Sequence, residues 1–134
     1  MSTTDEAIEQ EIQAKGLTAP RVTPTDIEAN IKSAFYFTAA QGAEKAARDN
    51  GSYMAGTPEE GQTLGCLTFC VLVLQNGFTV TGESACASPE NFDAELGRKI
   101  ARQNAVQKLW PLMGYALRQQ LHLAEQQDKQ ENPQ

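Results

Sequence analysis

The densest group of positive side chains in the sequence lies on one predicted helix. Arg98 and Arg102 are four residues apart and share a helix face, and Lys99 lies beside them, three residues before Arg102. Guanidinium groups with this spacing can hold a phosphate or a carboxylate through paired hydrogen bonds. The alternative is a solvated outer face, opposite Leu96 and Ile100. We expect the three basic residues to form the contact set if the protein binds an anionic ligand or an acidic partner.

Two aromatic residues follow the basic cluster and complete the candidate binding site. Trp110 and Tyr115 could stack on a base or on a partner side chain. The alternative is that they are core or interface aromatics. The predicted ligand or partner site therefore comprises Arg98, Lys99, Arg102, Trp110 and Tyr115.

The cysteines and the single histidine do not make a convincing metal site. A structural zinc site needs four ligands, whereas the sequence offers Cys66, Cys70, Cys86 and the distant His122. We interpret the cysteines as structural thiols and predict neither metal nor cofactor.

A group of carboxylates could be assigned acid and base roles or a Mg²⁺ ion. Glu83, Glu90, Asp93 and Glu95 lie close together in the sequence. Glu90 and Asp93, however, fall at a predicted helix start, where acidic residues are favourable for stability alone. No Gly-rich loop has the lysine and the strand-to-helix setting of a phosphate-binding loop. We predict no catalytic residue and no enzyme activity.

A β-hairpin precedes the basic helix. The apolar run from Leu67 to Leu74, followed by Asn76-Gly77 and then Phe78 to Thr81, predicts two strands joined by a type I′ turn. This turn would pair Val73 with Val80 and Val71 with Gly82. It would also place one apolar face in the core, made of Leu67, Phe69, Val71, Val73, Phe78 and Val80. A lone hairpin is marginal, so it needs a third strand, packed helices or a partner chain, and we expect helices to supply most of the cover.

Helices are predicted on both sides of the hairpin. Thr23-Pro24 starts one helix, whose apolar stripe continues through Phe35. A second helix, capped by Thr38, covers Ala39 to Asp49, and Tyr53 to Gln62 is expected to be a loop. The C-terminal helix begins at Ser88-Pro89-Glu90 and should kink or end at Trp110, before Pro111. Gly97 within it is expected to mark a close backbone contact, and Ala101 and Ala105 to allow close approach to the sheet.

These elements predict an α+β fold in which an antiparallel hairpin packs against a long, kinked C-terminal helix and N-terminal helices. The expected domains are a flexible acidic arm over residues 1–20, which includes a weakly indicated helix from about Thr4 to Lys15, a single domain over 21–124, and a disordered tail over 125–134. Apolar surface left by this arrangement favours a homodimer.

Composition narrows the function classes. The 134 residues carry a formal net charge of −6, which argues against a protein whose whole surface grips nucleic acid or an anionic membrane. No apolar run approaches the roughly twenty residues of a membrane span. The odd number of cysteines and the absence of a signal sequence predict a cytoplasmic protein.

Three segments resemble one family of proteins. The segments NGFTVTGESAC, NFDAELGRKIARQNA and WPLMGY are similar to the gene product 49/66 family of small tailed-phage and prophage proteins, and the similarity covers roughly Val22 to Leu121. The resemblance implies a phage origin and an accessory, non-virion role in the cytoplasm of the infected bacterium. It transfers no catalytic residue.

We therefore expect a phage accessory protein that acts by binding, with a counter-defence role as an inhibitor of a host or defence protein. A different possibility is a sponge that sequesters a phosphorylated nucleotide immune signal. A nucleic-acid-binding protein and a metal-dependent hydrolase that uses Glu83 and its neighbours are also considered. The order helix, hairpin, helix is similar to double-stranded RNA-binding domains, but the acidic charge and the lack of a third strand argue against them.

Overall fold

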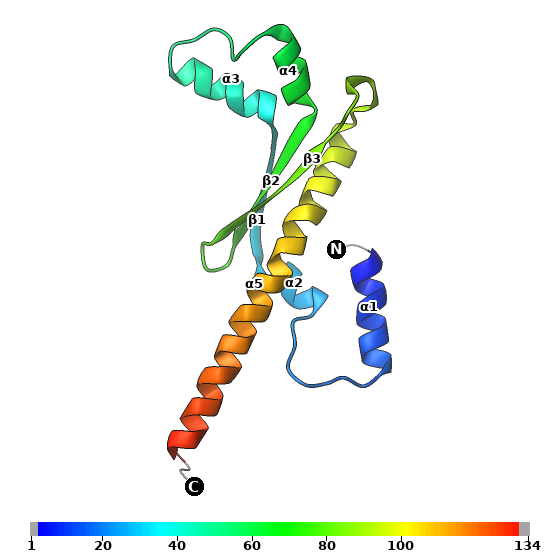
Figure 1. Ribbon diagram of the computed structural model, residues 1–134, viewed down its shortest axis with the longest axis vertical. Helices are drawn as coiled ribbons and strands as arrows, with labels where there is room; N and C mark the ends of the chain where they lie inside the picture. Colours follow the sequence, from blue (N-terminus) through cyan, green and yellow to red (C-terminus); the bar gives the residue numbers. More distant parts are fainter. Residues whose placement is uncertain (1–2, 132–134) are drawn as a thin grey trace. The chain divides into compact units, whose positions relative to one another are not determined.

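The computed structural model describes residues 3–131, and its contacts group the chain into two compact units. Among the described residues, the terminal unit contains 3–30 and 108–131, and the sheet unit contains 31–107. A three-stranded antiparallel sheet and several helices confirm the α+β class (Figure 1). The domain boundaries at residues 21 and 124 stay a prediction.

The terminal unit holds α1 (Thr3–Ala14), α2 (Pro24–Asn30) and the second part of α5 (Ala94–Glu131). The helix expected near Thr4 to Lys15 is confirmed, and Arg21 ties it down through two hydrogen bonds of 2.6 and 2.8 Å to the Glu9 carboxylate. These hydrogen bonds lower the pKa of Glu9 to about 2. The predicted start of α2 is also confirmed, because the Thr23 hydroxyl accepts a hydrogen bond from the Asp26 amide at 3.1 Å.

The helix expected to run through Phe35 is wrong in its second half. α2 ends at Asn30, and the next eight residues form strand β1 (Ile31–Thr38), which pairs antiparallel with β2 (Leu67–Leu74). The β1 sequence is rich in aromatic and β-branched residues, which pack well on a sheet, and ladder hydrogen bonds to β2 override the helical spacing of its apolar residues. The sheet order β1-β2-β3 thus contains the third strand that the sequence did not indicate.

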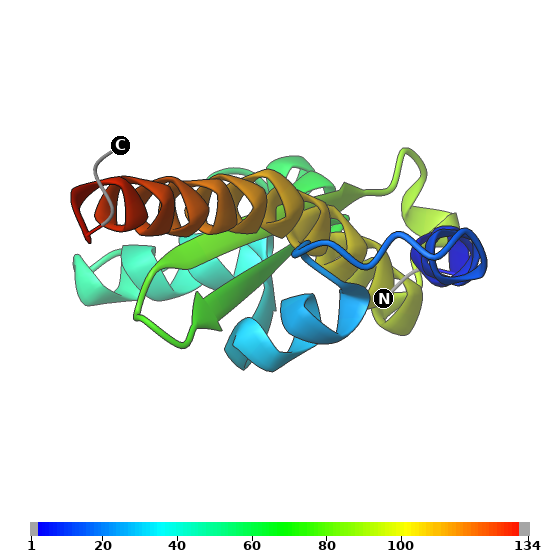
Figure 2. The same cartoon turned by 90° about the horizontal axis from the view of Figure 1, so that it is seen from below.

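The hairpin between β2 and β3 (Thr79–Ala85) is confirmed, but its turn and register are not those predicted. The Gly77 amide donates to the Leu74 carbonyl at 2.9 Å, and the Leu74 amide donates to the Phe78 carbonyl at 2.8 Å. The loop therefore has three residues, with Gly77 at φ +89° and no positive φ at Asn76, which excludes a type I′ turn. This turn, which can be followed in Figure 2, shifts the pairing by one residue, so that Val73 faces Thr79.

Replacing Gly77 by valine should lower the free energy of unfolding by about 1–2 kcal/mol, because a β-branched residue resists the left-handed backbone that this turn requires. Gly77→Asn is the matched control and should lose much less, since asparagine tolerates this conformation. Urea unfolding of both variants checks the expectation. Equal midpoints for the valine variant and the unmodified protein would contradict the turn.

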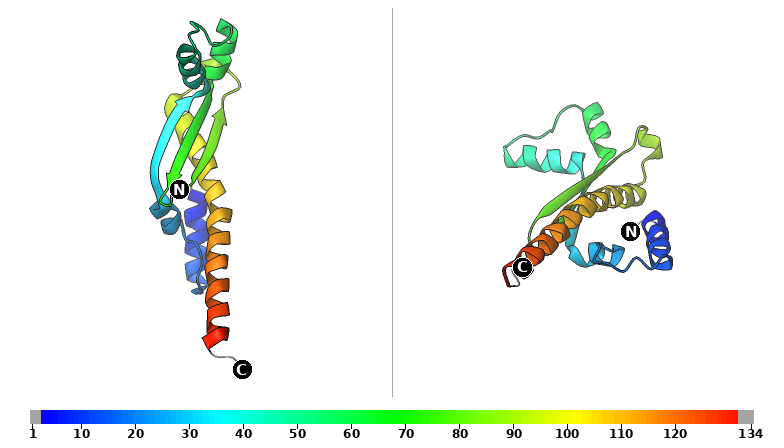
Figure 3. Two further views of the ribbon diagram at one scale, coloured as in Figure 1. Left: turned by 90° about the vertical axis from the view of Figure 1, so that its left-hand side faces the viewer. Right: turned by 60° about the horizontal axis from the view of Figure 1, so that its bottom comes forward.

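The buried face of β2 is the opposite of the one expected, whereas Val80 of β3 is buried as predicted. Thr68, Cys70, Leu72 and Leu74 are the buried residues of β2, whereas the alternate positions are only half-buried. Residues 94–107 of α5 lie over the buried face, where a Cβ on Gly82 would overlap the Ala101 carbonyl and come within 2.9 Å of the Ala105 Cα (Figure 3). The prediction of the β2 core face was wrong because β2 is apolar on both faces. The one-residue shift in pairing places Val80 opposite Leu72 instead of opposite Val73.

The helices of the sheet unit follow their capping residues. α3 (Ala39–Asp49) is confirmed with its predicted Thr38 cap. The expected loop instead contains α4 (Pro58–Gly65), capped by Thr57 and Glu60, and Ser88-Pro89 starts only the short 3₁₀ helix Pro89–Asn91. α3 and α4 lie together at one end of the sheet, shown at the top of Figure 1.

The C-terminal helix is longer than expected. α5 runs from Ala94 to Glu131 with Pro111 inside it, so it does not end at Trp110. Pro111 removes one backbone hydrogen bond from the helix. The residues on both sides have high helix propensity, which offsets this loss, so the helix continues through Pro111. Residues 125–131, expected to be a disordered tail, are helical, and the rest of that predicted tail lies outside the described residues.

Candidate anion-binding site

A hollow of about 310 Å³ opens in the sheet unit beside the start of α5. Side chains from β1, α3, β2 and the first turn of α5 contribute to its wall. The lining residues are Tyr36, Phe37, Thr38, Gln41, Thr68, Phe92, Ala94 and Arg98. Arg98 is the one charged residue in this described lining, which contains no carboxylate although the chain has 17 acidic residues against 11 lysines and arginines. The hollow is therefore a locally positive place in an acidic protein.

Two helix N-termini border the hollow and add to its positive character. Thr38 caps α3: its hydroxyl accepts from the Gln41 amide at 3.2 Å, and its own amide donates to the Gln41 side chain at 2.9 Å. α5 begins at Ala94, and the Asp93 carboxylate, outside the lining, accepts from the Leu96 amide at 3.0 Å. The first-turn amides of a helix carry a partial positive charge that favours anions.

Thr68 brings an unsatisfied polar atom to the wall of the hollow. It pairs with Thr38 across the sheet and is only 3% exposed, and its hydroxyl oxygen has no hydrogen-bond partner among the described residues. Helix α5 comes close here because residue 97 is glycine: a Cβ on Gly97 would lie 3.0 Å from the Thr68 hydroxyl oxygen. The sequence prediction that Gly97 marks a close contact is confirmed.

The three basic residues predicted from the sequence do not act alike. Arg98 lines the hollow and forms no hydrogen bond or ion pair within the described part of the chain. Arg102 is half-buried and donates a hydrogen bond to the Tyr36 hydroxyl at 3.5 Å. Lys99 is exposed and pairs with Glu95 at 3.7 Å. Arg98 is thus the cation available to a ligand, Arg102 supports the Tyr36 wall, and Lys99 lies outside the lining.

The cysteine nearest to this site is not poised for nucleophilic chemistry. Cys70 pairs with Tyr36 in the sheet and is fully buried. Burial raises the pKa of its thiol, and the hydrogen bond to Tyr36 and the charge of Arg102 counteract this only in part. A protonated, buried thiol is a poor nucleophile. Over residues 3–131, no three or more His, Cys, Asp or Glu side chains gather as a metal site would require.

The two predicted aromatic site residues belong to the terminal unit. Trp110 is half-buried, and its indole N–H lacks a hydrogen-bond partner in the described residues, while Tyr115 is largely exposed. Their role in binding stays a prediction.

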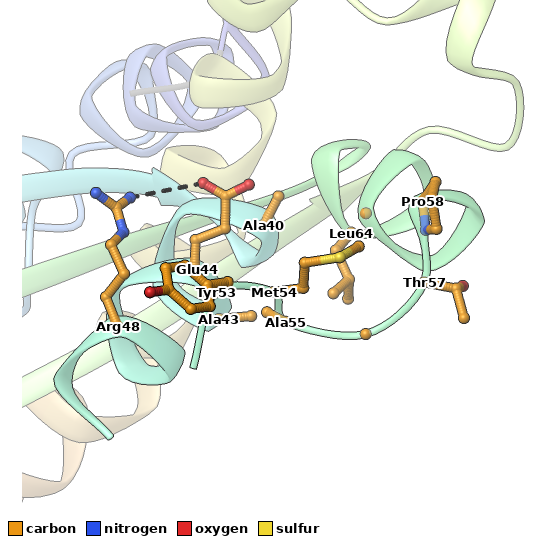
Figure 4. A pocket seen from close by; sticks show the side chains of 12 residues that line it. Ala40, Ala43, Glu44, Arg48, Tyr53, Met54, Ala55, Thr57, Pro58 and Leu64 are labelled. Carbon is orange, nitrogen blue, oxygen red and sulfur yellow. Dashed lines mark ion pairs between the residues drawn. The ribbon is translucent and has the colours of Figure 1, made fainter. Parts of the chain in front are cut away.

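A second hollow of about 460 Å³ lies between α3, α4 and the segment that joins them (Figure 4). Its wall includes small apolar residues such as Ala40 and Ala43, and the ion pair between Glu44 and Arg48 at 3.8 Å stands at its side. Sequence reasoning missed this hollow because it assigned the α4 residues to a loop. The Thr57 and Glu60 capping pair, with Pro58 between them, was the signal that could have found α4.

The sheet face away from α5 is an open apolar surface. Phe35 is 56% exposed and Phe37 is 38% exposed, and the ring of Phe37 lies 5.6 Å from that of Phe69. Val71 and Val73 continue the surface along β2 and are half-buried. We call these five residues the open sheet face. The sequence did not reveal it, because Phe35 was assigned to a helix and the β2 residues to the core.

The fold defines a small α+β protein with two hollows and an open apolar sheet face, and the comparisons with known proteins supply its family. The chain belongs to the phage protein (N4 Gp49/phage Sf6 gene 66) family, whose model matches residues 22–121. This confirms the resemblance seen in the sequence and identifies a phage protein. No curated protein and no solved structure matches the chain.

The structure also bears on two expectations, one about membrane-spanning helices and one about a double-stranded RNA-binding arrangement. In the described part of the chain, none of the helices combines the length and the apolar character needed to cross a bilayer. The third strand gives the order α2, β1, β2, β3, α5, interrupted by α3 and α4, so a missing strand no longer argues against a double-stranded RNA-binding arrangement. The net charge of −6 still argues against binding to the phosphate backbone of RNA, and we continue to expect no nucleic acid partner.

Proposed function

We propose that this phage protein acts by binding, and that it docks on a host or defence protein through the open sheet face and inhibits it. The proposal places it in the cytoplasm of the infected bacterium. It is carried by a single observation: aromatic and aliphatic side chains of two adjacent strands form one continuous surface, of which Phe35 is the most exposed member.

The physical support is the cost of such a surface in water. Contiguous exposed apolar patches of this kind mark interaction sites, because covering them releases roughly 25 cal/mol for each Å² of apolar area. Phenylalanine and other aromatics are enriched at the cores of interfaces, while charged residues are depleted there. The open sheet face has this composition, since its five members are Phe35, Phe37, Phe69, Val71 and Val73.

Affinity capture from a lysate of the host bacterium tests the proposal. Phe35→Ala should reduce recovery of a specific host protein at least about tenfold, because truncating a central anchor commonly costs about 2 kcal/mol or more of binding. The free energy of unfolding should change by less than about 1 kcal/mol, since the ring is already more than half exposed. Tyr53→Ala is the matched control: it removes an exposed aromatic ring outside the open sheet face and should leave recovery unchanged.

Light scattering on the same variants separates docking from self-association. If Phe35→Ala converts a dimer into a monomer and no host protein is ever recovered, the open sheet face is a homodimer interface and the docking proposal is wrong. If both variants recover the same host protein equally, the partner binds elsewhere.

A second candidate function is the sequestration of a phosphorylated nucleotide. The observation that favours it is the unpaired Arg98 in a hollow without carboxylates in its described lining. The hydrolase hypothesis has no comparable support.

A further inference from the structure

We propose that the hollow beside α5 is a binding site for a small oxyanion carried on an aromatic ring, with Arg98 as its main contact. The inference goes beyond the docking of a protein partner, and it deepens the second candidate function by naming the recognised chemistry. It rests on the hollow alone and does not depend on the open sheet face.

The charge of the site comes first. Arg98 contributes a full positive charge, and the N-termini of α3 and α5 contribute partial charges at the same wall. No carboxylate belongs to the described lining, so the charge of Arg98 has no counter-ion in the wall, although the Asp93 carboxylate caps the N-terminus of α5 from outside it. An arginine without a partner, next to backbone amides, is suited to a phosphate or a carboxylate, which accept several hydrogen bonds at once.

The unsatisfied hydroxyl of Thr68 is an independent observation. A buried hydroxyl without a hydrogen bond costs on the order of 1–3 kcal/mol, so native proteins seldom leave one unpaired. Thr68 lines the hollow, but its hydroxyl oxygen has almost no accessible surface and lies against Gly97, so a bound oxyanion reaches this hydroxyl only when the first turn of α5 moves away from it. A ligand that displaces this turn satisfies a group that the protein by itself leaves unpaired.

The size and the remaining lining define the rest of the ligand. A volume of about 310 Å³ suits a small molecule. The rings of Tyr36 and Phe92 form the apolar part of the wall, and Arg102 donates a hydrogen bond to the Tyr36 hydroxyl from one turn further along α5. Aromatic walls favour a flat ring through offset or edge contacts. The ligand class is therefore an aromatic phosphate or an aromatic carboxylate.

Titration of the full chain with phenyl phosphate, followed by calorimetry and by backbone amide NMR shifts, tests the site. We expect shifts centred on Gln41, Thr68 and Ala94, and a lower Kd for phenyl phosphate than for inorganic phosphate because of the aromatic wall. Benzoate and adenosine monophosphate are parallel arms. Tighter binding of benzoate assigns the site to carboxylates, and tighter binding of phenyl phosphate assigns it to phosphates. If phenyl phosphate binds and the nucleotide does not, the site stands and the nucleotide-sequestering function fails.

Two variants and one matched control make the test specific. Arg98→Gln should weaken phenyl phosphate binding at least about tenfold, whereas Lys99→Gln, which removes the same charge one residue away, should weaken it less than about threefold. Thr68→Val should weaken binding several-fold without lowering the melting temperature, because it removes an unpaired hydroxyl and keeps the shape. Equal losses for Arg98→Gln and Lys99→Gln would indicate diffuse charge attraction and overturn the site, as would the absence of binding at millimolar phenyl phosphate.

Discussion

Gly82→Ala should destabilise the protein by about 3 kcal/mol or more, the largest effect that we expect from adding a single methyl group. A Cβ at this position would overlap the Ala101 carbonyl and the Ala105 amide of α5, and would lie 2.9 Å from the Ala105 Cα. These are backbone atoms of a helix, which cannot move aside as the end of a side chain can, so the helix must lift from the sheet. Urea unfolding followed by circular dichroism measures the loss.

Gly61→Ala in α4 is the matched control, because a Cβ built there meets no described atom within 4 Å beyond its chain neighbours and the backbone of its own helix. Alanine is the better helix former, by up to about 1 kcal/mol, so this variant should be slightly more stable than the unmodified protein. If Gly82→Ala unfolds at the same urea concentration as Gly61→Ala, α5 does not pack as closely on β3 as the structure shows.

The contact between α5 and β3 is one part of the fold that could be predicted from the sequence. Ala101 and Ala105, expected to allow close approach to the sheet, are fully buried. The strands around Asn76-Gly77, the cap at Thr38 and the start at Pro24 were also predicted correctly, since each is governed by a few neighbouring residues. Local backbone chemistry of this kind can be read directly from a sequence.

The sequence predictions were wrong where the local sequence is compatible with two conformations and tertiary contacts select one of them. Ile31 and Phe35 fit a helical stripe, but they lie on a strand because β2 supplies a pairing partner. β2 is apolar at nearly every position, so periodicity could not identify its buried face. The choice depended on a turn one residue longer than expected and on where α5 packs.

The candidate site shows the same division between local and tertiary information. Arg98 and Arg102 could be recognised from charge density and helical spacing, and the structure brings both to the Tyr36 wall. Thr68 could not, because its importance lies in being buried without a hydrogen-bond partner among the described residues, and only the assembled sheet and helix create that condition. Sequence reasoning therefore found the cation of the site and missed its buried hydroxyl.

Leu72→Ala should destabilise the protein by about 2–5 kcal/mol, and it tests the corrected register directly. Leu72 has no exposed surface and lies between Ala34 and Val80 in the buried row of the sheet. Truncating it removes apolar burial and leaves a cavity that a sheet covered by α5 cannot fully close. Denaturation in urea and, separately, in guanidinium chloride measures the decrease in the free energy of unfolding and shows whether the two denaturants give the same value.

Val73→Ala provides the comparison, because Val73 is the next residue of the same strand but points to the open sheet face. It should cost roughly 1 kcal/mol or less, since the side chain is only half-buried. The core face predicted from the sequence requires the opposite order, with Val73 in the core and Leu72 on the other face of the hairpin. A larger loss for Val73→Ala than for Leu72→Ala would restore that core face, and with it would remove Phe35, Val71 and Val73 from the surface proposed for partner docking.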